Sequence, residues 1–366
     1  MTDTDILFSP VTMGAVELPN RVLMAPLTRN RAHPDGTPWE VAQTYYAQRA
    51  SAGMIVTEAT QVTPYGKGYV GTPGIHDPSH VAAWKEITDA VHAEGGRIYL
   101  QLWHVGRISH VSLLPDGATP QAPSAIRADQ KTFTANGFED CSEPHAMTVE
   151  EIGEVVEAYR TGARNAKDAG FDGVEVHAAN GYLIDQFLQD STNRRDDAYG
   201  GSIENRMRFL REVLDAVTSV WERDRVGIRL SPLGQANDMG DSDPEGHFGA
   251  IYKMLSDEKL AYLHVVESFY GTETKSEERD VLMRLRKLYD GFYIANGSLD
   301  AETASRVIAS GHAQAATFGR PFIANPDLPE RFRTGAELNL QDQDTFYGGD
   351  ETGYIDYPFL KAIEPV

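Results

Sequence analysis

The chain has 366 residues, of which 41% are hydrophobic and 24% are charged, so it can bury a sizeable core and has ordinary globular composition. Its 33 Lys and Arg against 54 Asp and Glu give a net charge of −21, which disfavours phosphate backbones and anionic lipids as partners; we expect no nucleic-acid and no membrane role. The single cysteine, Cys141, excludes an intrachain disulfide and a cysteine-based metal cluster.

The first residues lack both the basic region and the apolar segment that mark a secretory signal peptide. No run of the sequence approaches the roughly 18 apolar residues that a membrane span needs. We therefore expect a cytoplasmic location.

Short apolar segments alternate with amphipathic stretches along the chain. Residues 6–20 predict a small hairpin that turns near Met13 and Gly14 and closes the floor of a barrel. Several of the eight segments that follow are nearly continuous in Val, Ile and Leu, as in strands buried on both faces. These strands are expected at residues 21–25, 54–57, 97–102, 173–176, 226–230, 262–266, 292–295 and 315–318.

A plausible helix follows each strand. Thr148 and Glu151 form a capping-box pattern before one helix, and another begins near Ser202. Eight β-then-α units predict an α/β chain folded as a single-domain (β/α)8 TIM barrel over residues 1–366. A doubly wound open sheet is the alternative.

Two segments do not fit the repeat. Residues 105–147 form a long excursion after the third strand, rich in Pro, Gly and Ala, and a long loop of this kind usually covers the active-site face of a barrel. Residues 341–366 contain no clear helix. They either fold back over the same face or form a frayed tail.

The residues just after the strands are polar and varied, and functional residues of such barrels gather there. Gly297 and Gly319 follow the seventh and eighth strands, where backbone N–H groups can approach a phosphate, and Arg320 adds charge. Arg229 ends the fifth strand. It needs a buried acceptor, which is either an internal salt bridge or an electron-rich cofactor.

His177 and Asn180 follow the fourth strand, and two donors converging on one oxygen would polarise a carbonyl or nitro group. Tyr182 follows the same strand and is either a proton donor to the substrate or an aromatic side chain packed in the core. No carboxylate or second histidine shares the spacing, so we expect no metal. Three aromatic residues in or beside loops are candidates for a pocket wall or for the core: Tyr69, Trp103 and Tyr347.

The sequence resembles the Old Yellow Enzyme family of FMN-dependent ene-reductases nearly from end to end. The motifs that carry the resemblance are NRVLMAPLTR at 20–29, QLWHVGR at 101–107, HAANGYLIDQFL at 177–188, NRRDDAYGGSIENR at 193–206 and FGRPFIANP at 318–326. Thr28 together with His-x-x-Asn resembles the branch that includes bacterial nitrate-ester and N-ethylmaleimide reductases. Residues 234–239 depart from the family pattern, and residues 268–274, which vary in the family, are expected to influence substrate choice.

The resemblance implies a tightly bound, non-covalent FMN and NADPH or NADH as reductant. It implies that His177 and Asn180 bind the activating oxygen of the substrate and that Tyr182 donates the proton. The FMN contacts that it implies are Pro26, Thr28, Ala59, Gln101 and Arg229 around the ring and Gly297, Ser298, Gly319 and Arg320 around the phosphate.

The implied reaction is reduction of the C=C bond of α,β-unsaturated carbonyl or nitro compounds by ping-pong hydride transfer through flavin N5, with nitrate esters as a further substrate class. The expected partners are therefore these small molecules and a nicotinamide, and the expected state is a monomer or homodimer. Two other readings stay open: a phosphate-binding lyase or aldolase, which would want a base or a Schiff-base lysine at a strand end, and a non-catalytic ligand-binding barrel.

Overall fold

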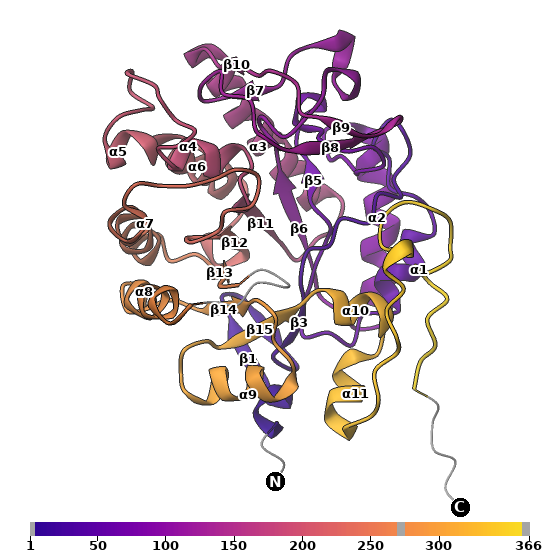
Figure 1. Ribbon diagram of the computed structural model, residues 1–366. Coiled ribbons are helices and arrows are strands. Elements are labelled where there is room, and N and C mark those ends of the chain that lie inside the picture. Colours follow the sequence, from indigo (N-terminus) through magenta and orange to yellow (C-terminus); the bar gives the residue numbers. More distant parts are fainter. Residues whose placement is uncertain (1–3, 269–274, 361–366) are drawn as a thin grey trace, which may run out of the picture.

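The computed structural model describes residues 4–268 and 275–360. Eight parallel strands follow one another around a closed barrel in the order β11–β12–β13–β14–β15–β3–β4–β6, and β6 pairs with β11 to complete the circle (Figure 1). The closure confirms the predicted (β/α)8 TIM barrel, and the alternative of a doubly wound open sheet is wrong.

The barrel strands lie close to their predicted positions. Strand β4 is shorter than predicted. The chain leaves β6 after Thr57, whose N–H still binds the Tyr99 carbonyl, and it pairs with β6 again in β5 (Thr60–Gln61). The eight barrel strands are β3 (Val22–Met24), β4 (Ile55–Val56), β6 (Ile98–Trp103), β11 (Gly173–Ala178), β12 (Val226–Leu230), β13 (Tyr262–Val266), β14 (Tyr293–Asn296) and β15 (Ala315–Phe318).

Helices surround the barrel. The predicted capping box is present, because the Thr148 hydroxyl accepts from the Glu151 N–H and the Glu151 carboxylate accepts from the Thr148 N–H. No described helix is both long and apolar enough to cross a membrane. The helices are α1 (Ala42–Ala47), α2 (Pro78–Ala93), α3 (Val149–Asp168), α4 (Leu183–Leu188), α5 (Ile203–Arg206), α6 (Arg208–Thr218), α7 (Pro244–Glu258), α8 (Ser276–Arg286), α9 (Ala301–Ala309), α10 (Arg320–Ala324) and α11 (Leu328–Thr334).

The N-terminal hairpin closes the barrel floor, as predicted. It consists of β1 (Val11–Met13) and β2 (Val16–Leu18), and its buried side chains pack on residues of the barrel strands, Tyr99 and Tyr262 among them. These two tyrosines lie beside glycines of the neighbouring strands, in the register pairs Tyr99–Gly173 and Tyr262–Gly227. The glycines leave the space that the rings fill.

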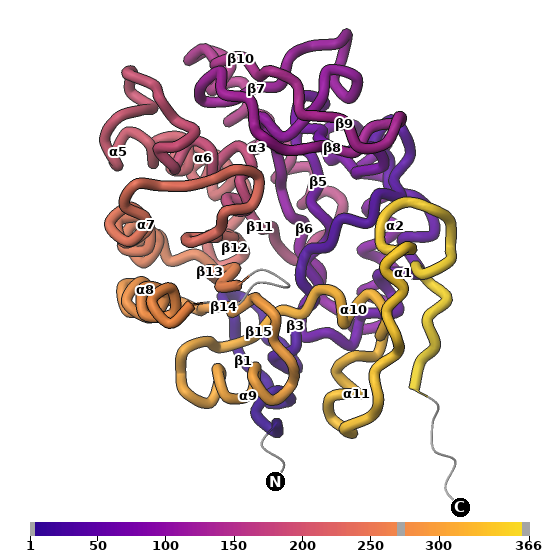
Figure 2. Tube along the Cα trace, in the orientation of Figure 1, coloured from indigo at the N-terminus to yellow at the C-terminus, as the bar shows by residue number. Residues whose placement is uncertain are grey.

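The two irregular segments lie around the opposite end of the barrel (Figure 2). The excursion after β6 contains β7 (Gln121–Ala122), β10 (His145–Ala146) and a hairpin formed by β8 (Lys131–Thr134) and β9 (Gly137–Asp140). Within the described residues 341–360, the C-terminal segment has only a 3-10 turn, at Gln343–Thr345, and it folds back beside α1 and α10. Over residues 341–360 the reading as a frayed tail is therefore wrong.

Gly227→Ala is expected to lower the free energy of unfolding by about 1–3 kcal/mol, because a Cβ atom there would overlap the Tyr262 ring in a packed core. Gly153→Ala is the matched control. Gly153 is exposed in α3 and a Cβ atom there meets nothing within 4 Å, so alanine should raise the stability by about 0.5–1 kcal/mol. Denaturant unfolding of both variants tests the packing, and equal effects would contradict it.

Candidate active site

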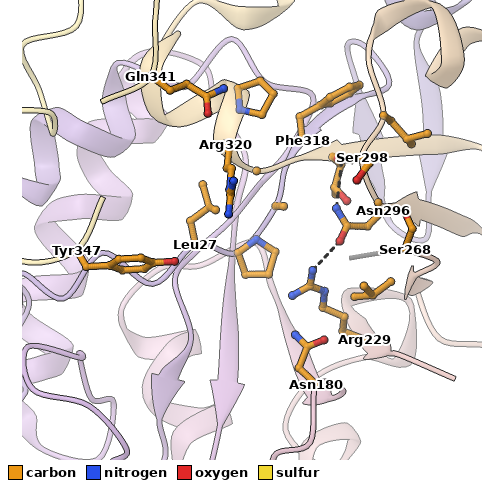
Figure 3. A pocket seen from close by; sticks show the side chains of 18 residues that line it. Leu27, Asn180, Arg229, Ser268, Asn296, Ser298, Phe318, Arg320, Gln341 and Tyr347 are labelled. Atoms are coloured by element: carbon orange, nitrogen blue, oxygen red, sulfur yellow. Dashed lines mark hydrogen bonds between the residues drawn. The ribbon is translucent and has the colours of Figure 1, made fainter. Parts of the chain in front are cut away.

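A cavity of about 550 Å³ opens at the carboxyl ends of the barrel strands (Figure 3). Its walls come from the ends of β3, β12, β13, β14 and β15 and from the loops that follow them. The predicted site residues among its lining are Pro26, Asn180, Arg229, Gly297, Ser298, Gly319, Arg320 and Tyr347. Residues as far apart in the sequence as Pro26 and Tyr347 therefore meet in one cavity.

The cavity is positively charged although the chain is strongly acidic. Arg229 and Arg320 line it, and none of the described lining residues is Asp or Glu. Arg229 is 8% exposed and donates from Nη2 to Asn296 Oδ1 at 2.8 Å, while its Nε has no hydrogen-bond partner among the described residues. A buried N–H without an acceptor is costly, so the geometry favours an electron-rich ligand here.

The stretch after β14 takes an unusual backbone path beside the cavity. Gly297 and Ser298 both have positive φ, 143° and 43°. A Cβ atom at Gly297 would overlap Ser268, so only glycine fits this approach. Gly319 and Arg320 reach the same cavity from the end of β15.

A second cavity of about 620 Å³ adjoins the first, because Pro26, Leu27, Arg320 and Tyr347 line both. Besides Pro26, Arg320 and Tyr347, the predicted site residues that line it are Thr28, Tyr69 and Tyr182. The β8–β9 hairpin contributes its outer wall with Lys131, Phe133 and Phe138. These hairpin residues were missed from the sequence because the hairpin lies far from any strand end.

His177 is the next-to-last residue of β11, and Asn180 follows in the turn just beyond the strand. The His177 ring is 3% exposed and its Nδ1 has no partner among the described residues; the same holds for the Asn180 side-chain oxygen. Burial, together with the charge of Arg229, lowers the pKa of His177 to about 3. The imidazole is therefore neutral near pH 7 and can donate one hydrogen bond.

Tyr182 forms a hydroxyl pair with Tyr69, with the two oxygens 3.1 Å apart. The Tyr182 ring also contacts Trp103 and His177, with ring centroids 5.0 and 5.2 Å apart. Burial raises the pKa of Tyr182, so its hydroxyl stays protonated at neutral pH. The arrangement provides an O–H donor with a second hydroxyl behind it.

Four predicted site residues do not line either cavity. His177 lies directly behind Tyr182, and Ala59 and Trp103 form a buried cluster behind Tyr69 and Tyr182. Gln101 is 1% exposed and donates through Nε2 to Glu175 Oε1 at 2.7 Å. These residues support the walls of the site in this structure.

The atypical segment after β12 takes part in the site. Asn237 donates from Nδ2 to the Asn180 carbonyl at 2.8 Å, and Arg107 binds the carbonyls of Asn237 and Asp238. Asn237 and Asp238 both have positive φ. In the other loop that we expected to influence substrate choice, residues 269–274 lie outside the described part of the chain.

The C-terminal segment that carries Tyr347 is held by two buried arginines. Arg29 donates to the carbonyls of Phe346 and Gly353, at 2.9 and 2.8 Å. Arg31 donates to the carbonyls of Asp350, Thr345 and Thr352, at 2.9 to 3.1 Å. Because Arg29 directly follows Thr28, the same loop supplies a cavity residue and anchors the cavity's outer wall.

The chain is similar to several known flavin oxidoreductases over nearly its whole length. Residues 6–339 match the model of the NADH:flavin oxidoreductase / NADH oxidase family. The chain is 44% identical to 12-oxophytodienoate reductase 1 of Oryza sativa subsp. japonica over 98% of this chain and 94% of the relative. Morphinone reductase in complex with tetrahydroNAD has a similar structure, at 49% identity and a TM-score of 0.92, covering 98% of this chain and 99% of that one. An Old Yellow Enzyme homologue from Zymomonas mobilis gives 43% identity and a TM-score of 0.93, covering 97% and 99%.

Arg31→Ala is expected to lower the free energy of unfolding by about 2–3 kcal/mol, because it removes charge-assisted hydrogen bonds to three carbonyls. Amide exchange should accelerate in residues 345–353. Arg306→Ala, which removes an exposed pair with Glu302 on α9, should change stability by no more than about 0.5 kcal/mol. Unfolding and hydrogen exchange of both variants test the anchor; unchanged exchange in Arg31→Ala would contradict it.

Proposed function

The chain belongs to the NADH:flavin oxidoreductase / NADH oxidase family and is an FMN-dependent oxidoreductase of the Old Yellow Enzyme type, and from this we propose that it reduces the C=C bond of α,β-unsaturated carbonyl and nitro compounds. The observation that carries the proposal is the set of polar groups at the end of β11, namely the neutral, buried His177, Asn180 and the Tyr182–Tyr69 hydroxyl pair, next to a cationic cavity.

The residues present fit FMN. The cavity volume of about 550 Å³ is in the range of about 300–1,000 Å³ that ligands of this size occupy. The unpartnered Nε of Arg229 suits the electron-rich edge of the ring. We propose Pro26, Thr28, Ala59 and Gln101 as further ring contacts, and the phosphate site as Gly297, Ser298, Gly319 and Arg320.

When bound, FMN supplies the hydride chemistry, accepting a hydride from NADH or NADPH and giving it to the alkene. The protein residues bind and polarise the substrate. Hydrogen bonds from His177 and Asn180 draw electron density toward the carbonyl or nitro oxygen, which makes the distant alkene carbon electrophilic. Tyr182 then gives its proton to the other alkene carbon, and the Tyr69 hydroxyl, 3.1 Å away, can return a proton to Tyr182.

Tyr69, Trp103 and Tyr347 form the aromatic surroundings of the substrate in this proposal. Tyr69 and Trp103 are stacked with centroids 6.0 Å apart, and Tyr347 lines both cavities. A flat conjugated acceptor suits such walls. Nitrate esters form a second substrate class, because one hydride converts R–O–NO2 into the alcohol and nitrite without a further proton donor.

Replacing both His177 and Asn180 by Ala should leave FMN bound but weaken phenol and enone binding by about tenfold to a hundredfold, because two hydrogen bonds to the ligand oxygen are lost. Titration of the flavin absorbance with a phenol measures the affinity. Retention of wild-type affinity would rule out the proposed role of this pair.

Tyr182→Phe should slow alkene reduction about a hundredfold or more, the typical contribution of a general acid, and should spare reduction of the flavin by the nicotinamide. Nitrate-ester reduction should also be spared. Tyr159→Phe is the control, because Tyr159 is fully buried on α3, away from both cavities. Stopped-flow measurement of the half-reactions tests this; equal loss in both would contradict proton donation by Tyr182.

A further inference from the structure

A buried polar network runs through the barrel interior next to the cavity. Glu175 on β11 accepts from Gln101 Nε2 at 2.7 Å and bonds His264 Nδ1 at 2.9 Å. His264 Nε2 lies 2.9 Å from the Thr317 hydroxyl, and Thr317 lines the cavity. All four side chains are at most 2% exposed. The interior of such barrels is usually filled with branched apolar side chains, so this layer needs an explanation.

The carboxylate fixes the direction of every hydrogen bond in the network. An ionised carboxylate only accepts, so Gln101 must turn its NH2 group toward Glu175 and His264 must carry its proton on Nδ1. Burial opposes ionisation of Glu175, but His264 and Arg229 outweigh it and hold the pKa of this carboxyl below its ordinary value. Burial also lowers the pKa of His264, which favours the neutral imidazole. With His264 neutral, its Nε2 accepts from Thr317. The side-chain oxygen of Gln101 and the hydroxyl oxygen of Thr317 can therefore accept hydrogen bonds from other donors.

Glu175 also faces the cavity cation. In the strand register Glu175 pairs with Gly227 and His177 pairs with Arg229. Because Gly227 has no side chain, nothing on β12 separates Glu175 from Arg229, the next residue of that strand on the same face. Arg229 forms no ion pair within 4 Å in the described chain, and Glu175 is the carboxylate whose charge acts on it.

We propose that Glu175 is a positioning residue that balances the charge of Arg229 and orders Gln101, His264 and Thr317, and thereby sets the reduction potential of the bound flavin. The inference rests on the proposed placement of FMN beside Arg229. A reduced flavin carries negative charge near its N1–C2=O edge, so a buried carboxylate behind Arg229 weakens the stabilisation of that state. Glu175 would keep the flavin a sufficiently strong reductant.

The test is the midpoint potential of the FMN-loaded Glu175→Gln variant. We expect the equilibrium for two-electron reduction to shift at least tenfold toward the reduced form, which is about 30 mV to more positive potential. Glu175→Asp keeps the negative charge on a side chain that is one methylene group shorter. It should stay near the wild-type potential.

Asp241→Asn is the matched control. Asp241 is also a buried carboxylate between a histidine and an arginine, with His247 Nδ1 at 2.9 Å and Arg206 Nη1 at 2.7 Å. It lies in the loop before α7 and lines neither cavity. Its loss should destabilise the protein without moving the potential. An unchanged or more negative potential in Glu175→Gln, or an equal shift in Asp241→Asn, would overturn the proposal.

A second measurement does not need the cofactor. In FMN-free protein, Glu175→Gln leaves Arg229 without its counter-charge, so adding Arg229→Gln should raise the unfolding temperature above that of the single variant. A lower temperature in the double variant would overturn the charge balance. If the wild-type protein does not bind FMN, the proposed function fails, whereas this comparison still decides the relation between Glu175 and Arg229.

Discussion

The pairing of β6 with β11 closes the sheet into a barrel, and the arrangement of the site depends on that closure. The register sets Gln101 beside Glu175, and continues through β12 and β13 to set His177 beside Arg229 and Arg229 beside His264. Parallel strands also bring all their carboxyl ends to one rim. A shift of one residue in any of these ladders would turn the polar side chains into the outer helical layer.

The barrel interior combines two kinds of filling. Near the floor, tyrosine rings from β6 and β13 occupy the space above glycines of β11 and β12, and the N-terminal hairpin covers them. Nearer the rim, charged and amide side chains replace apolar ones and bind one another. The glycine at position 227 serves both levels, because it admits the Tyr262 ring and places no side chain of β12 between Glu175 and Arg229. Stability and the electrostatics of the cavity are therefore coupled at this position.

Much of this architecture could be predicted from the sequence, because buried parallel strands and capping boxes have local signatures. Three strands have the predicted bounds, and the helix after Thr148 begins where its capping box indicates. The strand ends also identified Arg229, Asn180 and Gly297 as cavity residues. The roles of Asn237, Phe138 and Arg31 could not be predicted, since each depends on contacts between loops that are distant in the sequence. Glu175 was overlooked because its neighbours in a strand look like an ordinary buried segment, and only the register shows what it faces.

The anchoring of the C-terminal segment has a consequence for the order in which the molecule is made. Arg29 and Phe346, which it binds, are separated by 317 residues. During synthesis on the ribosome the loop that carries Arg29 therefore emerges long before Phe346, and its guanidinium group meets this acceptor only near the end of translation. The last barrel strand, β15, is also made late, so the barrel and the wall of its pocket are both completed only when nearly the whole chain has been synthesised.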